Sequence, residues 1–172
     1  MKNRKTVIVV FMLVACMLIG VGYAAIESNL YMNGSINLTA DGAESELDED
    51  VYFTAVSNEN HCNANVDTTN SDIVIVRITD TNSIMAFEGD QSSFTATVQN
   101  DAGVDVVITP SFPAFEGVEF STDASEYVCL AGQTVEITFT ITLTDSVPET
   151  GISLEGTVDA PFVTFTVAEK IS

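Results

Sequence analysis

Residues 134–143 read TVEITFTITL, with an apolar side chain at every second position from Val135 to Leu143. Successive side chains of a strand point to opposite faces, so this alternation separates an apolar face from a face made mostly of threonine. Threonine suits a half-exposed sheet surface because its branched side chain packs well on the pleat. The segment therefore predicts a long strand with one buried face.

Shorter segments of the same kind recur along the chain. The predicted strands are residues 51–56, 73–78, 94–98, 104–108, 118–120, 127–130 and 162–167. Turn residues at 100–103 predict that two of them, 94–98 and 104–108, form a β-hairpin. The polar residues 57–71 show no periodicity and predict a loop.

After the first 25 residues, no segment has apolar residues at the three- and four-residue spacing of an amphipathic helix. Many short strands separated by Gly, Pro, Asn and Asp turns are typical of two antiparallel sheets packed face to face. We therefore expect an all-β, two-sheet antiparallel β-sandwich. The sequence leaves open whether its topology is jelly-roll or immunoglobulin-like.

Residues 26–38 also alternate between apolar or small side chains and polar ones. They predict an amphipathic strand near the amino terminus of the folded part. A terminal strand with an apolar face has to pair with a sheet. That sheet can belong to the same chain or to another molecule.

The first 24 residues have the layout of a secretory signal peptide. Lys2, Arg4 and Lys5 precede an apolar run at residues 7–21, and residues 22–24 supply a small-x-small pattern for a signal peptidase. We expect cleavage after residue 24 or 25, which gives a secreted, extracellular or cell-surface protein. The expected organisation is a signal peptide at 1–24, an amino-terminal strand at 25–40 and a β-sandwich domain at 41–172.

Two other fates of the leader stay open. Residues 6–26 approach the roughly 20 residues that cross a bilayer, so the leader could remain as an anchor. Cys16 follows Leu13, Val14 and Ala15 in the manner of a lipobox, which would give a lipoprotein. Contact with the membrane is expected only through an uncleaved leader.

The charge of the chain excludes one class of partner. It has 25 acidic and 5 basic residues, and three of the basic ones lie in the leader. The rest of the chain keeps Arg77 and Lys170 against 25 acids, a formal charge of 2 − 25 = −23. Such a surface repels phosphate backbones, so nucleic-acid binding is not expected.

The residues that could carry chemistry do not form a catalytic pattern. His61 is the single histidine, so a two-histidine zinc site cannot form, and no Gly-x-Ser-x-Gly nucleophile elbow is present. We expect no enzymatic activity and no required metal. The acidic run with Glu46, Asp48, Glu49 and Asp50 is a candidate calcium-binding loop, although it lacks the spaced ligands of an EF-hand.

Two cysteines, Cys62 and Cys129, remain once the leader is removed. Two cysteines in an exported protein are a candidate disulfide, and the long loop between them would strongly constrain the unfolded chain. The alternative is a pair of thiols that never meet.

The junction VGYAAI at residues 21–26, followed by LYMNGSI at 30–36, resembles the amino terminus of the TasA and camelysin family of bacterial surface and biofilm-matrix proteins. Residues 51–53, 94–103 and 130–135 resemble later strands of that family. The resemblance implies processing by a dedicated signal peptidase. It also implies self-association into extracellular matrix fibres by donor-strand complementation.

In this family the freed amino-terminal strand of one subunit would complete the sheet of the next. The residues that would fill the acceptor groove or allow close approach of the backbone are Ile26, Leu30, Met32, Gly34, Ile36 and Leu38. The alternative is a monomeric cell-surface binding module. In that case the strand folds into its own sheet and the acidic loops bind calcium or a partner.

Overall fold

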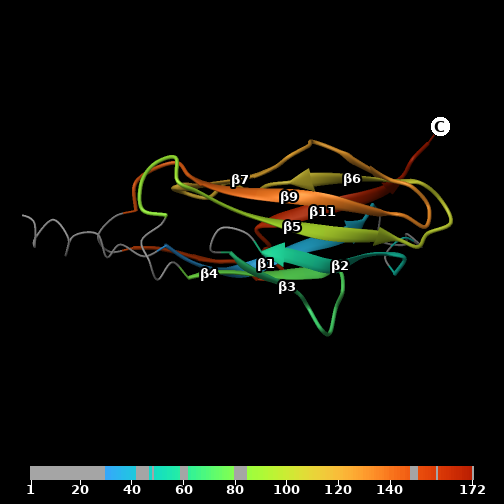
Figure 1. Ribbon diagram of the computed structural model, residues 1–172, viewed down its shortest axis with the longest axis horizontal. Helices are drawn as coiled ribbons and strands as arrows, with labels where there is room; N and C mark the ends of the chain where they lie inside the picture. The colour runs from blue at the N-terminus through green and yellow to red at the C-terminus, as the bar shows by residue number, and fades with distance from the viewer. Residues whose placement is uncertain are drawn as a thin grey trace, which may run out of the picture.

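The computed structural model describes residues 30–41, 47, 49–58, 62–79, 85–147, 151–157 and 159–171. Over these residues the chain forms eleven β-strands in two sheets, and no helix. Most strands run along the longest axis of the molecule (Figure 1). The same residues contain no apolar helix that could cross a bilayer. The predicted leader, with its apolar run at 7–21, lies outside the described residues.

The larger sheet has seven strands in the order β3-β4-β1-β11-β6-β8, with β10 paired to β1 on the side where β11 lies. These strands are β1 (Leu30–Ala40), β3 (Asn63–Val66), β4 (Ile73–Thr79), β6 (Val106–Ser111), β8 (Tyr127–Cys129), β10 (Ile152–Glu155) and β11 (Val163–Glu169). The amino-terminal strand β1 is therefore an interior strand of the larger sheet.

The smaller sheet has four antiparallel strands in the order β2-β5-β9-β7. They are β2 (Val51–Asn58), β5 (Gln91–Asn100), β7 (Val118–Thr122) and β9 (Thr134–Leu143). The segment TVEITFTITL is strand β9, as its alternation predicts. Its residues Ile137, Phe139, Ile141 and Leu143 are buried.

Aromatic side chains join the two sheets face to face. Phe94 of β5 stacks on Phe139 of β9 with ring centroids 4.6 Å apart. Phe139 meets Phe165 of β11 edge to face at 5.4 Å, so this contact crosses from one sheet to the other. Close offset and edge contacts of this kind add to the stabilisation from apolar burial. The predicted two-sheet β-sandwich is confirmed.

The predicted hairpin of 94–98 with 104–108 is wrong. Strand β5 lies in the four-stranded sheet and β6 in the seven-stranded sheet, so the turn between them crosses the sandwich. From β4 to β10 the described chain changes sheet at every step. This differs from the immunoglobulin arrangement, in which several consecutive strands share a sheet. Turn chemistry shows that the chain reverses, but it does not show which sheet the next strand joins.

Two strands were not predicted. Strand β3 lies within the polar segment 57–71, where only Ala64 and Val66 mark its inward face. Strand β10 has a single period of alternation in ISLE, which is too short to distinguish from a loop. Pairing with β4 and β1, respectively, decides both assignments.

Candidate functional site

Strand β1 lies at the centre of the larger sheet, where both of its edges are paired. On one side it is antiparallel to β4, with the register running from Tyr31 opposite Thr79 to Asn37 opposite Ile73. On the other side its first half pairs with β10 and its second half with β11. Removal of β1 would divide the sheet and leave a groove with β4 on one side and β10 followed by β11 on the other. We call this the β1 groove.

The pairing of β1 with β10 and β11 is parallel, whereas all other strand pairs in the described part of the chain are antiparallel. No hairpin joins β1 to a neighbour. Strand β4 follows only after β2 and β3, and β10 and β11 come from the other end of the chain. Non-covalent contacts therefore hold β1 in the groove. In the described part of the chain, its covalent link to the rest of the fold begins at Asp41.

The inward face of β1 consists of the predicted apolar residues. Leu30, Met32, Ile36 and Leu38 are buried, the last of them at 5% exposure. Complete burial of each such side chain stabilises the fold by roughly 1.5–3 kcal/mol. Ile26, the remaining predicted donor residue, lies outside the described residues. The sequence left open which sheet this strand joins, and in this single chain it joins its own.

Gly34 occupies the centre of the inward face, where β10 gives way to β11. A Cβ atom added there would lie 2.4 Å from Cε2 and 2.6 Å from Cζ of Phe162, and 2.9 Å from the Cα of Gly156. A Cβ atom added at Gly156 would lie 3.3 Å from the Cα of Gly34. The two glycines thus lie side by side beneath the ring of Phe162. A side chain at position 34 would have to displace that ring.

Backbone bonds continue along β1 through this junction. The N–H of Gly156 donates to the Asn33 carbonyl at 2.9 Å, and the N–H of Phe162 donates to the Ser35 carbonyl at 2.8 Å. The segment between them leaves the sheet and returns. The hydroxyl of Ser35 donates to the Thr157 carbonyl at 3.0 Å, which fixes this excursion over β1.

The sequence did not identify Phe162 and Gly156 as parts of this site. Phe162 was recognisable only as an apolar residue at the start of a strand, and Gly156 only as a turn residue. Their roles depend on β10 and β11 lying parallel to β1, and no local pattern reports this pairing.

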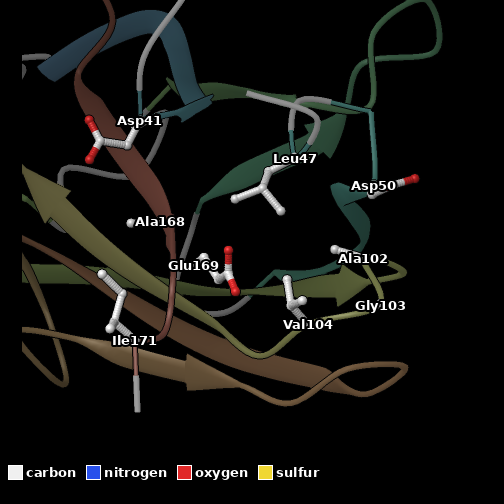
Figure 2. A pocket seen from close by; sticks show the side chains of 9 residues that line it. All are labelled: Asp41, Leu47, Asp50, Ala102, Gly103, Val104, Ala168, Glu169 and Ile171. Atoms are coloured by element: carbon white, nitrogen blue, oxygen red, sulfur yellow. The ribbon is translucent and has the colours of Figure 1, made fainter. Parts of the chain in front are cut away.

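A cavity of about 540 Å³ lies at the end of the sandwich where β1 leaves the sheet. Its lining includes the carboxylates of Asp41, Asp50 and Glu169 and the apolar side chains of Leu47 and Ile171. Figure 2 shows the three carboxylates spread around the cavity, with that of Asp50 directed away from the other two. Among the described residues, no group of three His, Cys, Asp or Glu side chains could hold a metal ion.

The candidate calcium loop is described only in part, because Glu46 and Asp48 lie outside the described residues, as does His61. Glu49 and Asp50 precede β2. The Asp50 carbonyl accepts a bond of 2.7 Å from the N–H of Asp101, which joins this loop to the turn after β5.

The candidate disulfide between Cys62 and Cys129 is not formed. Both residues are buried free thiols. Cys62 precedes β3 at one edge of the larger sheet and Cys129 ends β8 at the other edge, with four strands between them in the sheet order. A disulfide needs the two Cα atoms within about 7 Å. Burial raises the pKa of the Cys62 thiol to about 12.

Comparison with known proteins gives no relative from which a role could be transferred: no family model matches this chain, and no curated protein does. The functional argument therefore depends on the β1 groove and on the sequence.

Proposed function

We propose that this chain is a secreted structural subunit that builds extracellular matrix or surface fibres by exchanging β1 between copies. The observation that carries the proposal is the position of β1. It lies near the amino terminus, is fully paired inside a sheet, and has no hairpin connection to any neighbouring strand. A second copy can supply the same strand with the same contacts.

Exchange of an identical element between copies is a low-cost route to association. A copy that gives its β1 to a neighbour is left with its own groove open, and that groove accepts β1 from a third copy. Such head-to-tail contact does not close on itself, so it produces filaments. The leader holds β1 at the membrane before processing, which delays exchange until cleavage.

The segment that connects β1 to the rest of the fold suits this exchange. Residues 41–50 contain six carboxylates and no cation. Like charges along a connecting segment repel each other. Once β1 has left its own sheet, this repulsion favours a longer reach toward the groove of a neighbouring copy.

The resemblance to the TasA and camelysin family supports the same function. The family's fibres and its processed amino-terminal strand match the position of β1 and the leader-like residues before it. We therefore place the protein outside the cell, at the surface or in the biofilm matrix, with signal peptidase as its processing partner and further copies as its assembly partners.

The test uses two variants of the processed chain in which Cys62 and Cys129 are replaced by alanine, so that each carries a single introduced cysteine. Asn33 and Arg77 are register partners on β1 and β4, and Nε of Arg77 lies 3.4 Å from Oδ1 of Asn33. One copy carries Asn33→Cys and the other carries Arg77→Cys. Each variant has only one of the two new thiols, so a disulfide between these positions requires β1 of one copy to enter the groove of the other.

We expect covalent dimers on a non-reducing gel after the two variants are mixed, assembled and oxidised. The matched control replaces Arg77→Cys with Thr109→Cys, an exposed position on β6 that β11 separates from β1. No dimer is expected from the control pair. Fibres that form without the Asn33–Arg77 link would contradict strand exchange, and absence of both link and fibres would contradict the proposed function.

One observation favours the alternative function, a monomeric surface module: in the single chain β1 completes its own sheet. Such a module would remain a monomer at high concentration. Size-exclusion chromatography of the processed chain over time, with and without calcium, distinguishes a stable monomer from a subunit that assembles slowly as β1 is released.

A further inference from the structure

The contact between Gly34 and Phe162 limits which strand the β1 groove can hold. The space that a side chain at position 34 would need is occupied by the ring of Phe162, at 2.4 Å from the added Cβ. Cβ contacts below 3.0 Å essentially never occur in proteins, so the ring or the strand would have to move. An aromatic ring that covers a glycine in a neighbouring strand is a known device for fixing strand register.

The ring of Phe162 is held in place by its surroundings. It is completely buried, stacks on Phe120 with centroids 5.3 Å apart, and meets Phe115 edge to face at 5.5 Å. Its backbone N–H is bonded to the Ser35 carbonyl of β1. Burial between these rings restricts the movement of Phe162, so a side chain at position 34 meets a packed obstacle.

We infer that Phe162 selects the occupant of the β1 groove by requiring a glycine at the position of Gly34, and that the occupant in the assembled state is β1 of a second copy of this chain. This inference rests on the proposed function. A shift of β1 by two residues would place Met32 or Ile36 beneath the ring, and a shift by one would turn its apolar face outward.

The other strands in the described part of the chain cannot satisfy this requirement. Among the eleven described strands, β1 is the only one that contains a glycine. It also places buried apolar residues two and four positions before and after that glycine. The groove thus accepts a single register of β1 and rejects the other ten described strands. Filaments made in this way contain one kind of subunit.

The first experiment measures the steric contact in the processed chain without any assembly. Thermal unfolding is compared for the parent chain, Gly34→Ala, Phe162→Ala and the double variant. Gly34→Ala should lower the melting temperature clearly, because an added methyl group overpacks the core. In the Phe162→Ala background the same substitution should lower it clearly less, because the two ring contacts are gone and only the contact with the Cα of Gly156, at 2.9 Å, remains.

Gly103→Ala is the matched control, since an added Cβ there meets nothing within 4 Å. It should leave the melting temperature nearly unchanged. An equal loss from Gly34→Ala in both backgrounds, or a loss as small as that of Gly103→Ala, would overturn the inference.

The second experiment adds Gly34→Ala to the Asn33→Cys copy, whose β1 is the strand captured by the Arg77→Cys copy. The yield of covalent dimer should fall about tenfold or more. It should recover in large part when the Arg77→Cys copy also carries Phe162→Ala, because the ring no longer opposes the added methyl group and only the Cα of Gly156 stays within 3.0 Å of it.

These results separate the two ideas. If the parent pair cross-links and the Gly34→Ala strand cross-links equally well, the selection by Phe162 is wrong while strand exchange stands. If the parent pair fails to cross-link, the proposed function fails together with the partner named here. The thermal cycle then still reports whether Phe162 fixes the register of β1 within one chain.

Discussion

Asn100 is a buried polar residue that joins three parts of the chain. Its side-chain amide donates to the Val104 carbonyl at 3.0 Å and to the Cys129 carbonyl at 2.9 Å. Its backbone N–H donates to the Gln133 carbonyl at 3.0 Å. These bonds hold the crossing between the sheets against β8 and against the turn that leads into β9.

Asn100→Ala should therefore lower the free energy of unfolding by about 2 kcal/mol, because the carbonyl groups of Val104 and Cys129 lose their donor. Chemical denaturation of the two proteins measures the difference. Asn65→Ala is the control, since Asn65 is exposed and its side chain donates to that of the exposed Asn63. Equal effects of the two substitutions would show that Asn100 does not secure the crossing.

The buried thiols predict how stability changes in alkali. Burial raises the pKa of the Cys62 thiol from 9.0 to about 12. The pKa of Cys129 is also raised, mainly by burial and to a smaller extent by the negative charge of Asp105. A folded-state pKa above the unfolded value means that the folded protein holds its proton more tightly. The resulting stability is fully present below about pH 9 and is lost as the pH rises toward 12.

The free energy of unfolding should accordingly fall between pH 9 and pH 11, and Cys62→Ala should make that fall shallower. Denaturation series at fixed ionic strength measure both slopes. At neutral pH a thiol reagent should modify the two cysteines only as fast as the protein unfolds. Rapid modification of the folded protein would contradict their burial.

At the scale of the strand, sequence predicts faces better than partners. The alternation in residues 134–143 and in Leu30, Met32, Ile36 and Leu38 correctly marks the buried faces of β9 and β1. Pairing is decided by contacts between segments far apart in the chain. For that reason residues 94–108 were wrongly expected to form a hairpin, and the contact of Gly34 with Phe162 could not be predicted.

The two faces of β1 give an internal comparison for its role. Met32 is fully buried, whereas the adjacent Tyr31 is 41% exposed on the opposite face. Met32→Ala should lower the free energy of unfolding by roughly 2–5 kcal/mol, and Tyr31→Ala should lower it by less than about 1 kcal/mol. Denaturation midpoints of the two variants test this. Similar losses would mean that β1 is not held by its inward face.

At the scale of the whole molecule, the charge opposes association. Without the predicted leader, each copy carries a formal charge of −23. In the proposed exchange, copies have to approach closely before β1 can pass from one groove to another, so their mutual repulsion would limit the rate of assembly. Repulsion between exposed charges acts over about 10 Å at 0.1 M salt and about 3 Å at 1 M.

Assembly of the processed chain should therefore become faster as sodium chloride rises from 0.05 M to 1 M, as followed by light scattering and electron microscopy. Calcium chloride at the same ionic strength serves as the control. If screening alone controls the rate, the two salts should differ little, because their ionic strength is the same. A large acceleration that only calcium produces would show that a cation bound to the acidic segments bridges the copies. An assembly rate unaffected by either salt would mean that a step within one subunit, such as release of β1 from its own sheet, limits fibre growth.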